Sequence, residues 1–175
     1  MSELLEILLK RRSVRTYTGE AVPSEKLDEI IKAGLLAESG RRRCPWELIV
    51  VKDKEMLKKL SECRDGSAKM LAGADAAIVV IADEEKTDVW VEDSSIVMAN
   101  MHLMADHLGV GSCWIQGRLR KTPTGETTED YLRGLLGYPD NFRLEAILSL
   151  GMYDVHPEAY TLADVKLEKV HYEKY

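Results

Sequence analysis

Apolar residues recur along this chain in two patterns, one typical of amphipathic helices and one typical of buried strands. Helical spacing predicts helices over residues 3–11, 24–36, 54–63, 91–108 and 128–136. Short continuous apolar runs predict strands over residues 46–51, 76–82, 112–116 and 144–150. Three helices have a polar side chain suited to cap them, namely Ser24, Asp53 and Thr128. The first helix is expected to be mostly buried, and the helix over 91–108, apolar around much of its circumference, to lie inside the protein.

The order of these elements indicates the fold class. Two helices are followed by strand, helix, strand, long helix, strand, helix and strand, which is typical of a mixed α and β protein with helices on its sheet. The pattern leaves the strand directions open. Residues 153–175 are polar with scattered apolar positions, as in an extension that packs on a neighbour. No repeat or linker interrupts the chain, so we expect one domain over residues 1–175.

Composition narrows the class of protein. Of the 175 residues, 45% are hydrophobic and 31% are charged, so the chain can bury a core and stay soluble. No apolar run approaches the roughly 20 residues that span a bilayer, and residues 1–6 lack the basic start of a signal peptide. Three widely spaced cysteines argue against a disulfide framework and indicate a reducing cytoplasm. The net charge of −6 argues against nucleic acid as the main partner.

Residues 10–15, Lys-Arg-Arg-Ser-Val-Arg, form a basic cluster in this acidic chain. Four cations surround one serine hydroxyl at the end of the first predicted helix. Arginine forks and a hydroxyl offer several charge-assisted hydrogen bonds in fixed geometry, which suits a phosphate group. The alternative is a solvated helix end, because cations also stabilise the carbonyl pole of a helix.

A second basic run, residues 41–43, stands directly before Cys44 and a predicted strand. Alone it is typical of a solvated loop, although loops at strand ends often build sites. Flanking arginines lower the pKa of a thiol, so Cys44 could be a nucleophile; the lack of a partner base favours a small half-buried residue instead. Trp46 and Trp114 are expected in the core or in the wall of a pocket for a flat ring.

The common catalytic motifs are absent from the sequence. It contains no P-loop, no Gly-x-Ser-x-Gly elbow and no His-Glu-x-x-His, and we expect no metal site. His102 and His107 are five residues apart on one helix, so they lie on different faces and favour structural or surface roles. Gly109 and Gly111 follow a helix and open a strand, the reverse of a dinucleotide fingerprint. They predict a helix stop followed by backbone that a ligand can approach closely.

Five segments, taken in order, resemble the nitroreductase family of FMN-dependent oxidoreductases. They are residues 9–17 (Leu-Lys-Arg-Arg-Ser-Val-Arg-Thr-Tyr), 37–51, 93–116, 148–153 and 170–173 (Val-His-Tyr-Glu). The first resembles the family's Arg-Arg-Ser-x-Arg opening and the third its long interface helix with the strand after it. The resemblance covers nearly the whole chain. It implies an α+β fold, namely a three-layer α/β/α sandwich with a mixed, largely antiparallel sheet. It also implies an intertwined homodimer in which residues 153–175 wrap the partner and two FMN molecules lie at the interface.

The resemblance also implies which residues hold a tightly bound FMN. The basic cluster would contact its phosphate, ribityl chain and pyrimidine edge through Arg11, Arg12, Ser13 and Arg15. Arg15 would also stabilise the reduced flavin, and no side-chain acid or base is required. A loop of the other subunit would contribute Ser39, with Arg42 and Cys44 as further contacts. The strand end would line the flavin through Ile115, Gln116 and Gly117, with a backbone N–H aimed at N5.

Two departures from the family pattern bear on function. Residues 42–46, Arg-Arg-Cys-Pro-Trp, replace the usual Asn-x-Gln-Pro-Trp, so two amide side chains are lost, and the usual basic residue of the tail falls near Asp164. The implied reaction is a ping-pong one: NAD(P)H delivers hydride to flavin N5, leaves, and a small acceptor such as a nitroaromatic or quinone takes it. Two alternatives stay open, a flavin carrier or sensor with little turnover and a specialised member acting on one metabolite.

Overall fold

A computed structural model describes the whole chain, residues 1–175, as five helices, four strands and four short 3₁₀ turns. The helices are α1 (Glu3–Lys10), α2 (Ser24–Leu35), α3 (Lys54–Leu60), α4 (Trp90–His107) and α5 (Thr128–Leu136). The strands are β1 (Trp46–Val51), β2 (Ala76–Asp83), β3 (Gly111–Gln116) and β4 (Phe142–Gly151). The predicted order of helices and strands is confirmed, and the α+β class with it.

The four strands form one sheet in the order β1-β2-β4-β3, and every neighbouring pair is antiparallel. The expected largely antiparallel sheet is confirmed, and within one chain it contains no parallel pair that would make it mixed. The physical reason is the insertion of β4: β2 and β3 run in the same direction and are joined through α4, but β4 lies between them, so no parallel strands are neighbours. The sheet has two open edges, β1 on one side and β3 on the other.

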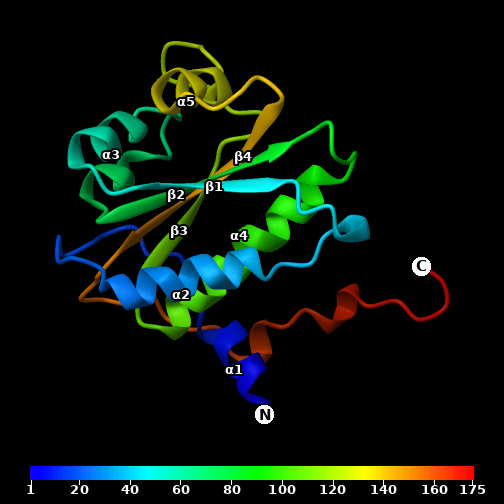
Figure 1. The fold of residues 1–175 in the computed structure, drawn as a ribbon. Helices are drawn as coiled ribbons and strands as arrows, with labels where there is room; N and C mark the ends of the chain where they lie inside the picture. The colour runs from blue at the N-terminus through cyan, green and yellow to red at the C-terminus, as the bar shows by residue number, and fades with distance from the viewer.

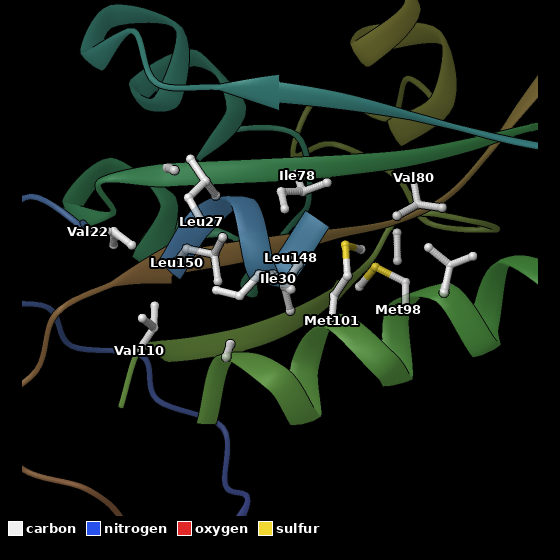
Figure 2. Close-up of a cluster of buried hydrophobic side chains, with 14 of the residues drawn as sticks. Val22, Leu27, Ile30, Ile78, Val80, Met98, Met101, Val110, Leu148 and Leu150 are labelled. Carbon is white, nitrogen blue, oxygen red and sulfur yellow. The ribbon is translucent and has the colours of Figure 1, made fainter. Parts of the chain in front are cut away.

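Helices cover both faces of the sheet, which gives three layers. Figure 1 shows α2 and α4 on one face and α3 and α5 on the other. Successive side chains of β2 point to opposite faces of the sheet, so the core consists of two clusters. Ile78 and Val80 belong to the cluster under α2 and α4, whereas Val79 and Ile81 belong to the cluster under α3 and α5. Figure 2 shows the first of these clusters, where methionines of α4 meet the sheet. Each fully buried Ile or Leu contributes about 1.5–3 kcal/mol, so the two clusters together carry the fold.

A glycine sets the close approach of α2 to α4. A Cβ on Gly34 would lie 2.7 Å from Met101 Cγ and 2.9 Å from its Sδ. Since real Cβ atoms do not make such contacts, Gly34 lets the two helices pack at this distance. This contact holds α4 against the sheet and so positions the functional residues on α4.

Two predicted helix caps are wrong by one residue. Helix α2 follows Pro23 as its N-cap, and Ser24 is already helical. Helix α5 is capped by Thr127, whose Oγ1 accepts from Asp130 N at 3.0 Å, while the buried Thr128 donates to Cys63 O at 2.7 Å. The cap predicted at Asp53 is confirmed, because its Oδ1 accepts from Met56 N at 2.8 Å.

Both ends of the chain are exposed, in contrast to the prediction for the first helix. No residue of α1 is buried, and Leu4 is 63% exposed, because α1 packs mainly against α4 rather than on the sheet. After β4 the tail first passes α1 and then extends away from the body, without further strands (Figure 1). Its apolar side chains are exposed, among them Val155, Leu162, Val165, Leu167, Val170 and Tyr172. None of the helices combines the length and the apolar character needed to cross a membrane.

Candidate functional site

The basic cluster leads into a segment that runs along the open edge of β3. Val14 N donates to Ser112 O at 2.9 Å, which ties this segment to the strand. Tyr17 donates to Val14 O at 3.0 Å, and its ring covers Gly151, where a Cβ would lie 2.6 Å from the ring. Gly111 is approached in the same way by Val14. The close approach predicted at Gly111 is therefore made by the chain itself.

Arg11 is held by a buried histidine of α4. Its Nη1 donates to His102 Nε2 at 2.6 Å, and the other ring nitrogen, Nδ1, lies 2.6 Å from Ser112 Oγ. Arginine has only donors, so Nε2 must accept and the imidazole proton must lie on Nδ1. Burial, and secondly the Arg11 charge, lower the pKa of His102 to about 4. His102 is thus a neutral acceptor that orients Arg11, which confirms a structural role for this histidine.

Arg12 is turned toward the tail of the same chain. Its guanidinium donates to Glu158 O and lies 4.4 Å from the centre of the Tyr160 ring. Its backbone N donates to Asp106 Oδ1 at 3.3 Å, and the same oxygen lies 2.7 Å from Nε2 of His156 in the tail. Arg12 and Asp106 therefore join the basic cluster to the tail.

Ser13 and Arg15 lie beside the Cys113 thiol of β3. Burial raises the pKa of this thiol, while the nearby Arg15, Ser13 and Arg11 side chains oppose the shift. None of the three arginines in the cluster pairs with a carboxylate. The cluster therefore presents uncompensated guanidinium groups and a hydroxyl at one strand edge, a donor set suited to an anion.

The end of β3 directs one backbone donor to the open edge. In an antiparallel pair, the backbone N–H and C=O groups of alternate residues point toward the neighbouring strand and away from it. Ser112 O accepts from Val14 on the open side, so the backbone groups of the even-numbered residues of β3 point to the edge. Gln116 therefore presents its N–H at the edge, whereas Gly117 N donates to Glu145 O at 3.2 Å. Ile115 is 1% exposed and packs among the residues facing α3 and α5. Its side chain does not reach the edge, because alternation along the strand turns it into the core.

A buried carboxyl lies directly behind this strand end. Glu145 is 3% exposed, and burial raises its pKa. Ser95 Oγ is 3.4 Å from Glu145 Oε1, and Oε2 has no partner. Gln116 joins this group, since its Nε2 donates to Glu145 O at 3.3 Å and its Oε1 accepts from Trp114 Nε1 at 2.9 Å. In the sequence, only the position of Glu145 within an otherwise apolar run indicates this buried carboxyl.

The second basic run lies at the other edge of the sheet, before β1. Its loop is anchored by Gly40 N, which donates to Asp93 Oδ1 at 2.9 Å near the start of α4. Arg41, Arg42 and Cys44 have φ values of 54°, 57° and 43°, a left-handed backbone that is strained for such residues. Cys44 is exposed, so the expected half-buried thiol is wrong: the tight loop turns its side chain outward.

One chain does not bring the predicted site residues together. Arg11, Ser13 and Arg15 line the β3 edge, whereas Ser39, Arg42 and Cys44 lie by the β1 edge. Their anchors on α4, His102 and Asp93, are nine residues apart, or about 13 Å along a helix. Each chain thus carries two separate halves of the predicted site.

Comparison with known proteins shows the family of this chain. The Nitroreductase family profile matches residues 8–64 and 57–152. A structure named FMN-dependent nitroreductase, from Clostridium difficile R20291, is 45% identical, covers 98% of this chain and 99% of its own, and superposes with a TM-score of 0.94. A protein of Archaeoglobus fulgidus with the provisional name NADH dehydrogenase/NAD(P)H nitroreductase is 38% identical over all of both chains. Iodotyrosine deiodinase 1 of Rattus norvegicus is 47% identical over 60 residues, 34% of this chain and 21% of its own. The chain belongs to the nitroreductase family.

Proposed function

We propose that this protein is an FMN-dependent oxidoreductase that takes hydride from NAD(P)H and passes it to a small acceptor, such as a nitroaromatic or a quinone, in a ping-pong cycle. The relatives that cover the whole chain support an NAD(P)H-dependent enzyme with FMN. The observation that carries the proposal is the row of donors along the open edge of β3, where the arginines of the basic cluster have no carboxylate partner. When bound, FMN supplies the two-electron chemistry, with hydride entering and leaving at N5.

The donor set of the β3 edge fits the phosphate end of FMN. Arg11 is held in place by His102, and the Ser13 hydroxyl lies close to the same strand, so both can bind phosphate oxygens at little ordering cost. Arg12 adds its charge to this end, while its guanidinium ties the tail to the site.

The remaining donors of the β3 edge, Arg15 and the Gln116 N–H, fit the flavin ring. Arg15 is exposed and has no carboxylate partner, and we assign it to the pyrimidine edge, where a cation stabilises the negative charge of the reduced ring. The Gln116 N–H, which faces the open edge, is the donor that we assign to N5. Its side chain is fixed by Trp114 and by the Glu145 carbonyl, so the strand end keeps its geometry through turnover.

A second copy of the chain would complete the site. We propose a homodimer in which the partner's loop places Ser39, Arg42 and Cys44 opposite the β3 edge and the tail over residues 153–175 wraps the partner. An exposed apolar hollow of about 410 Å³ between α1, α2 and α4 supports this, because such a surface is costly to leave in water. Three unpaired thiols fit the reducing cytoplasm that we propose as its compartment.

Steady-state oxidation of NADH and NADPH by the FMN-loaded protein tests the proposed reaction. We expect menadione or nitrofurazone to stimulate the oxidation, with the parallel-line pattern of a ping-pong mechanism. Tight FMN binding without stimulated oxidation contradicts the proposal and favours the flavin carrier. The loop at residues 38–44, which lacks the usual amides, is the feature that favours that second candidate.

A further inference from the structure

A polar hollow of about 620 Å³ lies where β3 ends, separate from the basic cluster at residues 10–15. It begins at Gly117, directly after the Gln116 donor, and is enclosed by the loop over 117–121 and the starts of α4 and α5. Trp90 forms its only aromatic wall. Apart from Gly117, none of the residues that line this hollow is used in the proposed binding of FMN.

The carboxylates in the wall are already paired. Arg143 lies 2.5 Å from Glu84 Oε1 and 3.1 Å from Glu129 Oε1. The hydrogen bond from Arg143 holds the pKa of Glu84 below its usual range. Glu129 Oε2 also accepts from Leu144 N at 2.8 Å. The Asp130 carboxylate accepts from the Thr127 hydroxyl, the cap of its own helix, and lies 3.4 Å from the Arg133 guanidinium. Arg143 and Arg133 therefore offset part of the negative charge on the acidic side of the hollow.

Three cations of the wall have no carboxylate partner: Arg118, Arg120 and Lys121. The Arg118 guanidinium lies 5.7 Å from the centre of the Trp90 ring, within reach of a cation–π contact. Arg120 Nη1 donates only to Leu119 O, at 3.1 Å. Three adjacent unpaired cations in a chain with a net charge of −6 mark a local preference for an anion.

The backbone that carries these cations is fixed by hydrogen bonds. Arg118 N donates to Glu145 O at 3.0 Å, and Arg120 N donates to Gly117 O at 3.1 Å. From outside the loop, Thr128 N donates to Arg120 O at 2.9 Å and Asp65 N donates to Lys121 O at 3.0 Å. A loop held in this way pays little ordering entropy when it binds a ligand.

We propose that the hollow binds a flat aromatic ring that bears an acidic group, with the ring against Trp90 and the acidic group against Arg118, Arg120 and Lys121. This inference rests on the proposed function, because the proposed reaction supplies the two candidate ligands. Either an acidic aromatic acceptor or the phosphorylated adenosine of NADPH supplies this chemistry next to the end of β3. The binding itself is independent of hydride transfer and can be measured without it.

Calorimetric titration of the FMN-loaded protein with two matched probe pairs tests the inference. The first pair is 4-nitrobenzoate and its neutral methyl ester, and the second is 2′,5′-ADP and 5′-AMP. We expect the more acidic member of at least one pair to bind ten-fold or more tightly than its counterpart. A preference within the first pair identifies an acceptor site, and one within the second identifies a nucleotide site. Equal affinities within both pairs overturn the proposal.

Substitutions in the wall of the hollow test whether this binding preference arises there. Arg118→Gln and Lys121→Gln should each remove most of it, and Trp90→Leu should weaken both members of the preferred pair. Lys58→Gln, which removes an exposed charge on α3, is the control and should change nothing. An equal loss in Lys58→Gln, or no loss in Arg118→Gln and Lys121→Gln, overturns the proposal. If the protein takes up FMN and oxidises NADPH but shows no preference, the inference fails and the proposed function stands. If the preference is present and depends on Arg118 but the protein has no reductase activity, the inference stands and the proposed function fails.

Discussion

The pair His102→Gln and His102→Asn tests how Arg11 is positioned at the proposed phosphate site. In the structure, His102 Nε2 accepts from Arg11 and Nδ1 donates to Ser112. A glutamine side chain places an oxygen near the position of Nε2, whereas an asparagine side chain reaches only the position of Nδ1. Gln therefore keeps the acceptor for Arg11, and Asn keeps only the contact to Ser112.

The magnitude follows from the kind of hydrogen bond that is lost. A hydrogen bond to a charged group contributes about 1.5–3 kcal/mol. Taking about 2 kcal/mol for the positioning of Arg11, we expect His102→Asn to raise the Kd for FMN roughly 30-fold, since about 1.4 kcal/mol corresponds to ten-fold. His102→Gln should raise it by no more than about three-fold, because the acceptor is retained.

The assay is titration of apo-protein with FMN, followed by quenching of flavin fluorescence, with urea unfolding of each apo-variant as the control. Both variants lose a packed imidazole, so a general packing effect would weaken FMN binding equally in the two. Equal Kd values for the Gln and Asn variants, or a wild-type Kd in both, would refute the positioning of Arg11 by His102.

Three further predictions follow from the same structure. The double variant Arg11→Ala/Ser13→Ala should lose FMN during gel filtration, because it removes a guanidinium and a hydroxyl of the proposed phosphate site; unchanged flavin occupancy would place the phosphate elsewhere. Gly34→Ala should lower the free energy of unfolding by about 1–3 kcal/mol, because the added methyl group overpacks against Met101. Gly134→Ala, which adds its methyl group in open space on α5, should raise the free energy of unfolding by up to about 1 kcal/mol. Urea unfolding curves that give the two variants equal stability would contradict the packing of α2 on α4. The pKa of His102 falls from 6.5 to about 4 on folding, so between these pH values the unfolded chain binds a proton that the folded chain does not. The free energy of unfolding should therefore drop by about 3 kcal/mol as the pH is lowered from 6.5 to 4. If the free energy of unfolding of a His102→Gln variant falls equally steeply over this range, His102 is not the group responsible.

Local features of the sequence were sufficient for the elements and for the basic cluster. Apolar runs such as residues 76–82 mark strands that are buried on both faces, and the charges of residues 10–15 are adjacent in the chain. The caps shifted by one residue because Thr127 and Thr128 offer the same hydroxyl, and only the backbone geometry decides which one faces the helix end. The exposed position of α1 depends on what surrounds it, which periodicity does not describe.

The contacts that shape the site were not visible in the sequence, because their partners are far apart in the chain. Arg11 meets His102 across 91 positions, and Arg12 reaches Glu158 across 146. The outward N–H of Gln116 and the inward side chain of Ile115 depend on the register of β3 against β4. Periodicity predicts that residues alternate along a strand but leaves open which of them face the open edge.

Co-elution of flavin with protein mass tests the central claim most directly, that the β3 edge of one chain and the loop of another hold FMN between them. Size-exclusion chromatography with light scattering and visible absorbance measures both quantities on one sample. We predict a yellow species with the mass of two 19.7 kDa chains and one FMN per chain. A colourless protein that takes up no FMN, or a yellow protein with the mass of one chain, would contradict this account.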